Sequence, residues 1–398
     1  MRTEVRLKVK SKFVNKYKSG YPLITKDTIM NPNVLDEEGS TINLVDEKNN
    51  FISKGYYGKQ NKGLGWVLSA KESETFDHSF FQKTLKAAFD QREFFYNSSE
   101  TTAFRVFNGE GDGIGGLTID YFDGYYLITW YSIGIYHFRE FIIDSLKELV
   151  EYKAIYQKKR FDESGKYIEE DDFVTGKRGE FPVIVKENGV NIAVYLNESA
   201  MVGVFLDQKD VRKALRDRYT QGKRVLNTFS YTGVFSVFSA LGGAKKTTSV
   251  DLANRSKRKT IEQFQVNGIA YEDQDIIVED VFNYFKYAVR KGLLFDVVIL
   301  DPPSFAKSKK FVFSAEKDYK NLLKDAISIT EDNGTILAST NSSSFNMDKF
   351  KGFIDTAFKE SKKRYKIMEE YSLPDDFRTN KHYPESDYLK VVFIKKIG

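Results

Sequence analysis

The segment best suited to do chemistry lies at residues 301–305 and reads Asp-Pro-Pro-Ser-Phe. It follows the apolar stretch 297–300, which predicts a buried strand. The two prolines restrict the backbone, so they can hold the Asp301 carboxylate and the Pro302 carbonyl as fixed hydrogen-bond acceptors. Phe305 can then stack on a flat base. The segment therefore indicates a site for a planar, polar substrate.

Two further carboxylates end predicted strands. Asp251 can accept hydrogen bonds from both hydroxyls of a ribose, and it can equally cap the helix that follows. Asp280 can accept from the amino group of an adenine. Val281 or Phe282 would then cover the adenine ring. These acids predict an adenosine-containing ligand.

The turn after the first of these strands, residues 227–233, ends in Gly233. Glycine lets a backbone approach a ligand closely. The turn lacks the three-glycine pattern of dinucleotide sites, whose pyrophosphate needs several close backbone amides. It suits an adenosyl amino acid, and it is also compatible with an ordinary strand-to-helix turn.

The C-terminal half must position these residues through regularly alternating elements. Such alternation predicts a Rossmann-like α/β fold, a parallel sheet with helices on both faces. Ligands bind beyond the carboxyl ends of such strands. The expected strands are 224–230, 246–251, 275–280, 295–301, 334–340, 366–371 and 388–396, and the expected helices are 233–241, 254–267, 281–291, 315–331 and 347–361.

The N-terminal half shows a different pattern of predicted elements. Short strands broken by turns predict a small β-barrel up to about residue 75, followed by a helix at 77–96. A mixed α/β region comes next, with an amphipathic helix at 136–150. Basic and acidic clusters within 157–180 predict an exposed loop or hairpin, and Asn188-Gly189 predicts a hairpin turn.

Composition limits the function classes. The net charge of +5 over 398 residues permits a polyanionic partner without requiring one. The absence of cysteine excludes disulfides, cysteine metal sites and thiol nucleophiles. The three histidines are far apart, so we expect no metal. No apolar run is long enough to span a membrane and the N-terminus lacks a signal-peptide core, so we expect a cytoplasmic protein.

Taken together, these motifs resemble the large-subunit ribosomal RNA methyltransferase I family, the cytosine-C5 group with an N-terminal PUA domain. The motifs that carry the resemblance are 110–120 (EGDGIGGLTID), 205–208 (FLDQ) with Arg212, 225–233 (VLNTFSYTG) and 301–305. It implies a PUA-like RNA-binding barrel at 1–75, a connecting helix and central α/β domain at 76–200, and an S-adenosylmethionine-dependent methyltransferase domain at 201–398. Large-subunit ribosomal RNA would be the partner, and a homodimer is compatible with the sequence.

The resemblance also implies roles for single residues. Gln208 and Arg212 would lie near the methionine end of the cofactor, where Arg212 suits the carboxylate, although an exposed helix arginine is an equal alternative. The other implied cofactor contacts are Ser230, Tyr231, Thr232, Asp251, Asp280 and Asp301.

One position departs from the family pattern. The cytosine-C5 members carry a cysteine after the fifth strand, and its thiolate adds to the base; here the stretch is Thr340-Asn341-Ser342. Asn341 cannot act as a nucleophile, so the chemistry favours a base nitrogen, which supplies its own lone pair. Asp301, Pro302 and Asn341 would then orient the base.

Alternatives to this interpretation stay open. The family label itself points to cytosine C5. A non-catalytic RNA-binding or ribosome-assembly protein that retains the cofactor pocket is a second possibility, and a small-molecule methyltransferase is a third. Basic residues expected near the rim of the site favour RNA. These are Lys307, Lys309, Lys310, Lys362, Lys363 and Arg364.

Overall fold

The computed structural model describes residues 4–60, 63–161, 168, 171–198, 201–307 and 312–397. The chain forms two compact units, and each is built from separate stretches of sequence. Unit 1 comprises residues 1–185, 195–202 and 375–386, and unit 2 comprises residues 186–194, 203–374 and 387–398. Among the described residues, no helix has the length and apolar character needed to cross a membrane.

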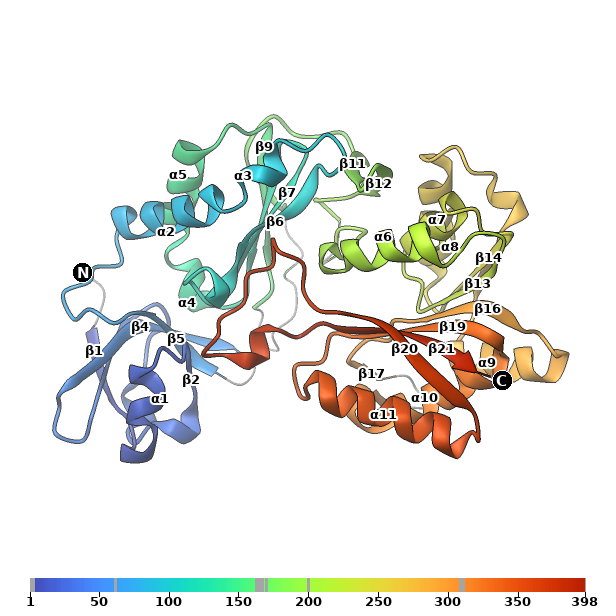
Figure 1. Ribbon diagram of the computed structural model, residues 1–398. Coiled ribbons are helices and arrows are strands. Elements are labelled where there is room, and N and C mark those ends of the chain that lie inside the picture. Colours follow the sequence, from blue (N-terminus) through green and yellow to red (C-terminus); the bar gives the residue numbers. More distant parts are fainter. Residues whose placement is uncertain are drawn as a thin grey trace. The chain divides into compact units, whose positions relative to one another are not determined.

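Unit 1 begins with the strands of the N-terminal barrel (Figure 1). Five strands pair in the order β1-β3-β4-β5-β2, with β1 parallel to β3 and the other neighbours antiparallel. The short helix α1, Val14–Lys18, lies between the first two strands in the sequence. The strands are β1 Glu4–Lys8, β2 Leu23–Ile24, β3 Thr41–Val45, β4 Phe51–Gln60 and β5 Gly63–Ser69.

A second five-stranded sheet completes unit 1, in the order β10-β9-β8-β7-β6. The helix predicted over 77–96 is interrupted at Gln91 and Arg92, so it forms two helices. The strands are β6 Ala103–Asn108, β7 Leu117–Phe122, β8 Tyr125–Trp130, β9 Ala154–Lys159 and β10 Phe173–Gly176. The helices are α2 His78–Asp90, α3 Glu93–Tyr96, α4 Ile133–Tyr136 and α5 Arg139–Leu149.

The barrel and the second sheet share one hydrophobic core, which runs from Leu7 to Ile155 in the sequence. Gly115, in the glycine-rich loop before β7, is a point of close packing between them. A Cβ atom there would lie only 2.1 Å from the Trp66 ring, and the Tyr56 hydroxyl donates to the Gly115 carbonyl at 2.7 Å. The loop therefore requires glycine because a barrel side chain packs directly on its backbone.

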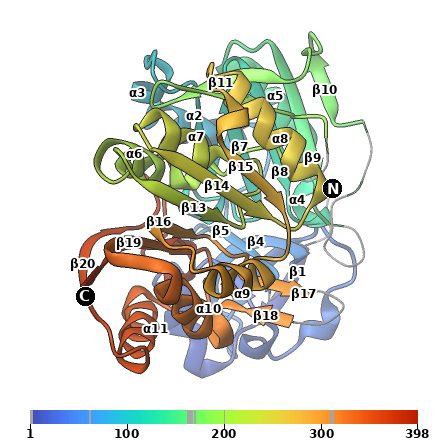
Figure 2. The same cartoon turned by 90° about the vertical axis from the view of Figure 1, so that its right-hand side faces the viewer.

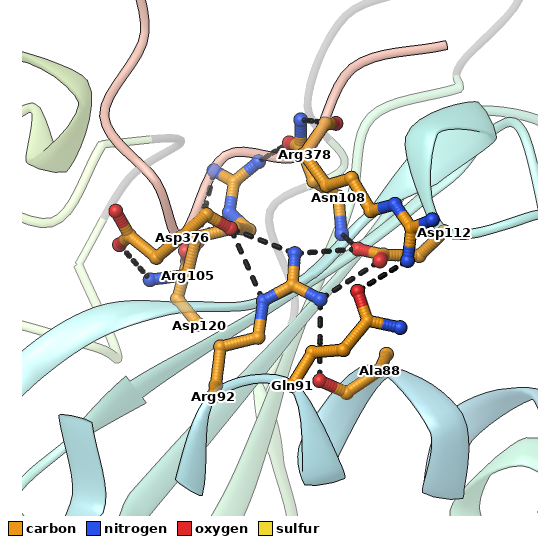
Figure 3. A network of polar contacts seen from close by, with 9 residues as sticks. All are labelled: Ala88, Gln91, Arg92, Arg105, Asn108, Asp112, Asp120, Asp376 and Arg378. Carbon is orange, nitrogen blue, oxygen red and sulfur yellow. Dashed lines mark hydrogen bonds and ion pairs between the residues drawn. The ribbon is translucent and has the colours of Figure 1, made fainter. Parts of the chain in front are cut away.

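The segment 375–386, which we call the strap, is held in unit 1 by a buried polar network (Figure 3). Arg92 forms a bidentate ion pair with Asp112, both nitrogen–oxygen distances being 2.8 Å. The same guanidinium donates to the Asp376 carbonyl at 2.7 and 3.2 Å. The backbone N–H of Arg105 donates to the Asp376 carboxylate at 2.9 Å. The strap is therefore bound through its backbone as well as its side chains.

Unit 2 contains a seven-stranded sheet in the order β15-β14-β13-β16-β19-β21-β20. The first five strands in this order run parallel, and β21 is antiparallel to both of its neighbours. The predicted doubly wound α/β architecture is confirmed. The strands are β13 Arg224–Thr228, β14 Lys246–Asp251, β15 Asp275–Val278, β16 Phe295–Leu300, β19 Thr330–Thr340, β20 Arg364–Tyr371 and β21 Lys390–Ile397.

Helices cover both faces of this sheet because its buried strands alternate their side chains. Val297 and Ile299 pack on the side of α6 and α7, whereas Val298 and Leu300 pack on the side of α9, α10 and α11; Figure 2 shows the two helical layers. Helix α6 was not among the predicted elements. The helices are α6 Lys209–Arg218, α7 Val234–Leu241, α8 Asn254–Gln265, α9 Val281–Lys291, α10 Ala315–Ile329 and α11 Met347–Glu360.

Two smaller predictions have different outcomes. The hairpin at Asn188-Gly189 is confirmed, since both residues have positive φ and join β11, Val183–Glu187, to β12, Val190–Val194. The exposed character expected for 157–180 is wrong at Lys158 and Asp172, which are buried and form an ion pair across β9 and β10. Burial lowers the pKa of Lys158, and its contact with Asp172 opposes that effect.

Candidate active site

The turn after β13 has an unusual backbone. Phe229, Tyr231 and Gly233 all have positive φ, at 54°, 52° and 79°. The backbone N–H of Tyr231 donates to one oxygen of Asp251 at 2.8 Å, and the N–H of Ala253 donates to the other at 2.9 Å. The turn and the acid that ends the neighbouring strand are therefore fixed to each other.

Asp251 keeps hydrogen-bonding capacity after these two contacts, because an ionised carboxylate can accept about four hydrogen bonds. The next residue, Leu252, is 62% exposed and adds an apolar surface beside the acid. In the same turn, Ser230 is buried. The Thr232 hydroxyl donates to the Gly203 carbonyl at 2.6 Å, so it is occupied within the protein.

Asp280 lies at the end of β15, where its carboxylate caps α9 by accepting from the Asn283 N–H at 3.1 Å. Val281 is buried in the core and does not present a surface for an adenine ring. Phe282 is only partly buried, and its ring packs edge-on against Phe229, which lies in the turn after β13. Of the two candidates for covering the ring, Phe282 is the one that keeps solvent-accessible surface.

Asp301, at the end of β16, is bound by groups from two other segments. Gln208 donates to its carboxylate at 2.8 Å, and the Ser339 hydroxyl is a second partner. Ser339 also donates to the Gln208 amide oxygen at 3.3 Å. Burial raises the pKa of Asp301 above its ordinary value, and the hydrogen bonds to Ser339 and Gln208 oppose that rise. Gln208 is therefore a direct partner of Asp301.

Arg212 is not free to bind a ligand carboxylate. Its guanidinium makes a bidentate ion pair with Glu187 at 2.6 and 2.7 Å and donates to the Phe205 carbonyl at 2.6 Å. Both charged side chains are buried. In place of the predicted role beside the methionine end, Arg212 has a structural role in holding the segment that carries Gln208.

The 301–305 segment and the end of β19 lie together. The Ser304 hydroxyl donates to the Asn341 amide oxygen at 2.5 Å. Pro302 is buried, whereas the Phe305 side chain is 63% exposed. An exposed ring at this position can take a planar group. The structure thus places Asp301, Phe305 and Asn341 at the carboxyl ends of two neighbouring parallel strands.

Three of the six residues predicted to form a basic rim lie away from the edge of the sheet that carries the site. Because β20 is antiparallel to β21, and β21 is antiparallel to β19, the start of β20 lies where the parallel strands begin. Lys362, Lys363 and Arg364 are therefore at the edge opposite the site, and Lys363 pairs with Asp332 there. Lys307 ends β17, Phe305–Lys307; Lys309 and Lys310 lie outside the described residues.

Some residues of the site could not be expected from the sequence. Ser339 and Ser304 are short hydroxyls with no distinctive spacing, and Glu187 lies 25 residues before its partner Arg212. The Phe205 ring packs against Tyr231 with centroids 5.4 Å apart. Here a signal existed, since both aromatics stand in motifs of the family resemblance.

The site fits an adenosyl amino acid. Carboxylates follow three strands of the parallel part of the sheet, β15, β14 and β16. Asp251 is held in place by backbone N–H groups and retains lone pairs for hydroxyls. Neither a nucleophilic thiol nor a cluster of three or more metal-ligating side chains occurs among the residues that the structure describes.

Comparison with known proteins agrees with this geometry. The S-adenosylmethionine-dependent methyltransferase family matches residues 106–379, and a PUA-like domain matches residues 7–70. "Putative ribosomal RNA large subunit methyltransferase YwbD" of Bacillus subtilis is 59% identical over 98% of this chain and 99% of its own. Ribosomal RNA large subunit methyltransferase I of Aeromonas salmonicida is 30% identical, over 90% of this chain and 91% of its own.

A solved structure extends the similarity to three dimensions. The crystal structure of SMU.776 complexed with SAH superimposes with a TM-score of 0.91 at 37% identity, over 98% of this chain and all of the other. The fold is thus a PUA-like domain joined to a class I methyltransferase domain, and S-adenosylmethionine is the cofactor. The chain belongs to the ribosomal RNA large subunit methyltransferase I family of S-adenosylmethionine-dependent methyltransferases.

Proposed function

We propose that this enzyme methylates a nitrogen of a base, most simply a purine, in large-subunit ribosomal RNA, without a covalent enzyme–base intermediate. The observation that carries the proposal is Asn341. It stands where a cytosine-C5 enzyme needs a thiol, in a chain that contains no cysteine. Its amide is hydrogen-bonded to Ser304 beside the 301–305 segment, as expected of a group that orients a base.

The relatives and the domain content support RNA as the substrate. Both curated relatives are named for large-subunit ribosomal RNA, and residues 7–70 match a PUA-like domain. We assign RNA gripping to the barrel of residues 1–75, a connecting role to 76–200 and methyl transfer to 201–398. Such a substrate would place the enzyme in the cytoplasm.

The described residues suggest a division of labour for transfer. When bound, S-adenosylmethionine supplies an electrophilic methyl group. Asp251 would hold the ribose hydroxyls and Asp280 the adenine amino group. Asp301 and the Pro302 carbonyl would accept from the target base.

The remaining residues act on the target base and on Asp301. Phe305 would stack on the base and Asn341 would fix its rotation. Gln208 keeps Asp301 in place. Because a base nitrogen has its own lone pair, transfer requires alignment at about 3–3.5 Å and exclusion of water. Where the target nitrogen carries a hydrogen, Asp301 would accept the proton that transfer releases.

Nucleoside analysis tests the proposal directly. Ribosomal RNA from a strain that lacks the gene should be incubated with pure enzyme and labelled S-adenosylmethionine, digested and examined by mass spectrometry. We expect one methylated nitrogen, and the Asp301→Ala variant should give none. RNA that contains 5-fluorocytosine should not trap the enzyme covalently. Finding 5-methylcytosine in the digest would overturn the proposal.

A further inference from the structure

Ser304 and Asn341 form an exposed pair in which the serine is the hydrogen-bond donor. The Ser304 hydroxyl donates to the amide oxygen of Asn341, and Asn341 itself is exposed. The amide nitrogen of Asn341 has no hydrogen-bond partner among the described residues. One lone pair of this amide oxygen is thus used by the protein, and the bond turns the two N–H donors toward a ligand.

Helix α10 holds the backbones on both sides of this pair. The N–H of its first residue, Ala315, donates to the Ser304 carbonyl at 3.0 Å. One turn further, the buried Tyr319 hydroxyl donates to the Ser339 carbonyl at 2.7 Å, two residues before Asn341. A hydrogen bond between two such anchored groups sets the amide orientation before any ligand arrives.

We propose that Ser304 is a specificity-determining positioning residue, which fixes Asn341 as a donor so that the site selects bases with an acceptor at that point of their edge. This inference rests on the proposed function. Asp301 and the Pro302 carbonyl offer acceptors at the neighbouring strand end, so the site presents acceptors beside a donor. A base with the reverse pattern would cover these polar groups and leave them unpaired.

The size of the discrimination follows from general energetics. An unpaired polar group that a bound base covers costs about 1–3 kcal/mol, which corresponds to roughly 5- to 150-fold in affinity or rate. Without Ser304, the amide could rotate and present its oxygen, and this selectivity would weaken. The proposal therefore predicts that Ser304 acts only through Asn341.

A double-mutant cycle tests this dependence. The kcat and KM for ribosomal RNA should be measured for wild type, Ser304→Ala, Asn341→Ala and the double variant. We expect Ser304→Ala to lose about 10-fold in kcat/KM, and to cause no further loss when Asn341 is already alanine. Ser304→Thr should restore activity because it keeps the hydroxyl. Asn341→Asp still accepts from Ser304 but has lost its donors, so it should be at least as impaired as Asn341→Ala.

The same four variants can be compared without turnover by measuring their affinity for RNA in the presence of S-adenosylhomocysteine. If the Ser304→Ala loss is equal in both backgrounds, or if Asn341→Asp keeps wild-type kcat/KM, the inference is wrong. Failure of the proposed function is seen separately, as 5-methylcytosine in the wild-type digest. Unchanged affinity for S-adenosylhomocysteine in Ser304→Ala is the expected control, and a loss of that affinity would show a general structural role and overturn the inference.

Discussion

Arg212 and Glu187 form a bidentate ion pair that is almost completely removed from solvent, with 2% of Arg212 and none of Glu187 exposed. The pair joins α6 to the end of β11. Because Arg212 also binds the Phe205 carbonyl, it fixes the short segment that leads to Gln208. A buried charge pair here positions the partner of Asp301.

Removing one member of this pair should destabilise unit 2. Arg212→Ala leaves the Glu187 carboxylate buried without its partner, so we expect a loss of about 3–5 kcal/mol in the free energy of unfolding. Urea denaturation followed by circular dichroism measures this. Arg258→Ala, on the exposed surface of α8, is the matched control and should change stability by less than about 0.5 kcal/mol. A comparable small change for Arg212→Ala would contradict the assigned role.

Cofactor binding should depend on Asp251. S-adenosylhomocysteine at about 100-fold over its dissociation constant should stabilise the protein by roughly 2.7 kcal/mol, visible as a rise in melting temperature. Asp251→Asn keeps the size of the side chain but loses the charge that ribose hydroxyls favour, so the rise should shrink. Asp273→Asn, an exposed acid just before β15, should retain the full rise. A full rise for Asp251→Asn would remove Asp251 from the site.

Glu110 predicts a pH dependence of stability in unit 1. Burial raises the pKa of Glu110 to about 7 from an ordinary 4.5, and the Asp112 carboxylate acts in the same direction. The folded state therefore binds the proton more tightly than the unfolded state. Its stability should be greatest at low pH within this window and should fall as pH rises from about 4.5 to about 7.

Thermal melts between pH 5 and pH 8 test this dependence on the wild-type chain. Glu110→Gln should flatten the pH profile, whereas Glu151→Gln, at an exposed position, should not. Equal slopes for the two variants would assign the pH dependence to other groups.

RNA binding should weaken with salt, and part of the effect should come from the barrel. Lys12 and Lys16 lie against aromatic rings of the barrel, with Lys16 3.5 Å from the centre of the Tyr21 ring. Removing one lysine–phosphate interaction should reduce the slope of log affinity against log salt by about 0.7 to 0.9. The Lys12→Gln/Lys16→Gln variant removes two such interactions, so it should show about twice this reduction, roughly 1.4 to 1.8, in a filter-binding titration.

Lys362→Gln, at the opposite edge of the catalytic sheet, provides the control and should leave the slope unchanged. A larger effect for Lys362 than for the barrel pair would place the RNA path elsewhere. Point substitutions are preferable to deleting the barrel, because its core continues into the second sheet.

The parallel sheet could be predicted because each of its strands can be recognised from a short stretch of sequence. Strands such as 297–300 are apolar throughout, and the acids that follow Val250 and Leu300 mark where those strands end. The two-face packing of the sheet then follows from alternation along each strand. The site residues at the strand ends could be predicted for the same reason.

The buried charges could not be predicted in this way. Lys158 lies in a basic run and Asp172 in an acidic one, and each run alone is typical of a solvated surface. Only the pairing of β9 with β10 brings the two together and removes them from water. Likewise Arg212 has the spacing of a ligand-binding residue, and its partner Glu187 is revealed only by the tertiary structure.

The strap also determines when unit 1 can be completed during synthesis. Arg92 and Asp112 are made early, whereas the Asp376 carbonyl that completes their network lies 284 residues after Arg92. A nascent chain must therefore hold the Arg92 guanidinium without its final acceptor while every strand of the catalytic sheet except β21 is translated. The polar network of unit 1 is therefore completed only after those strands have been made.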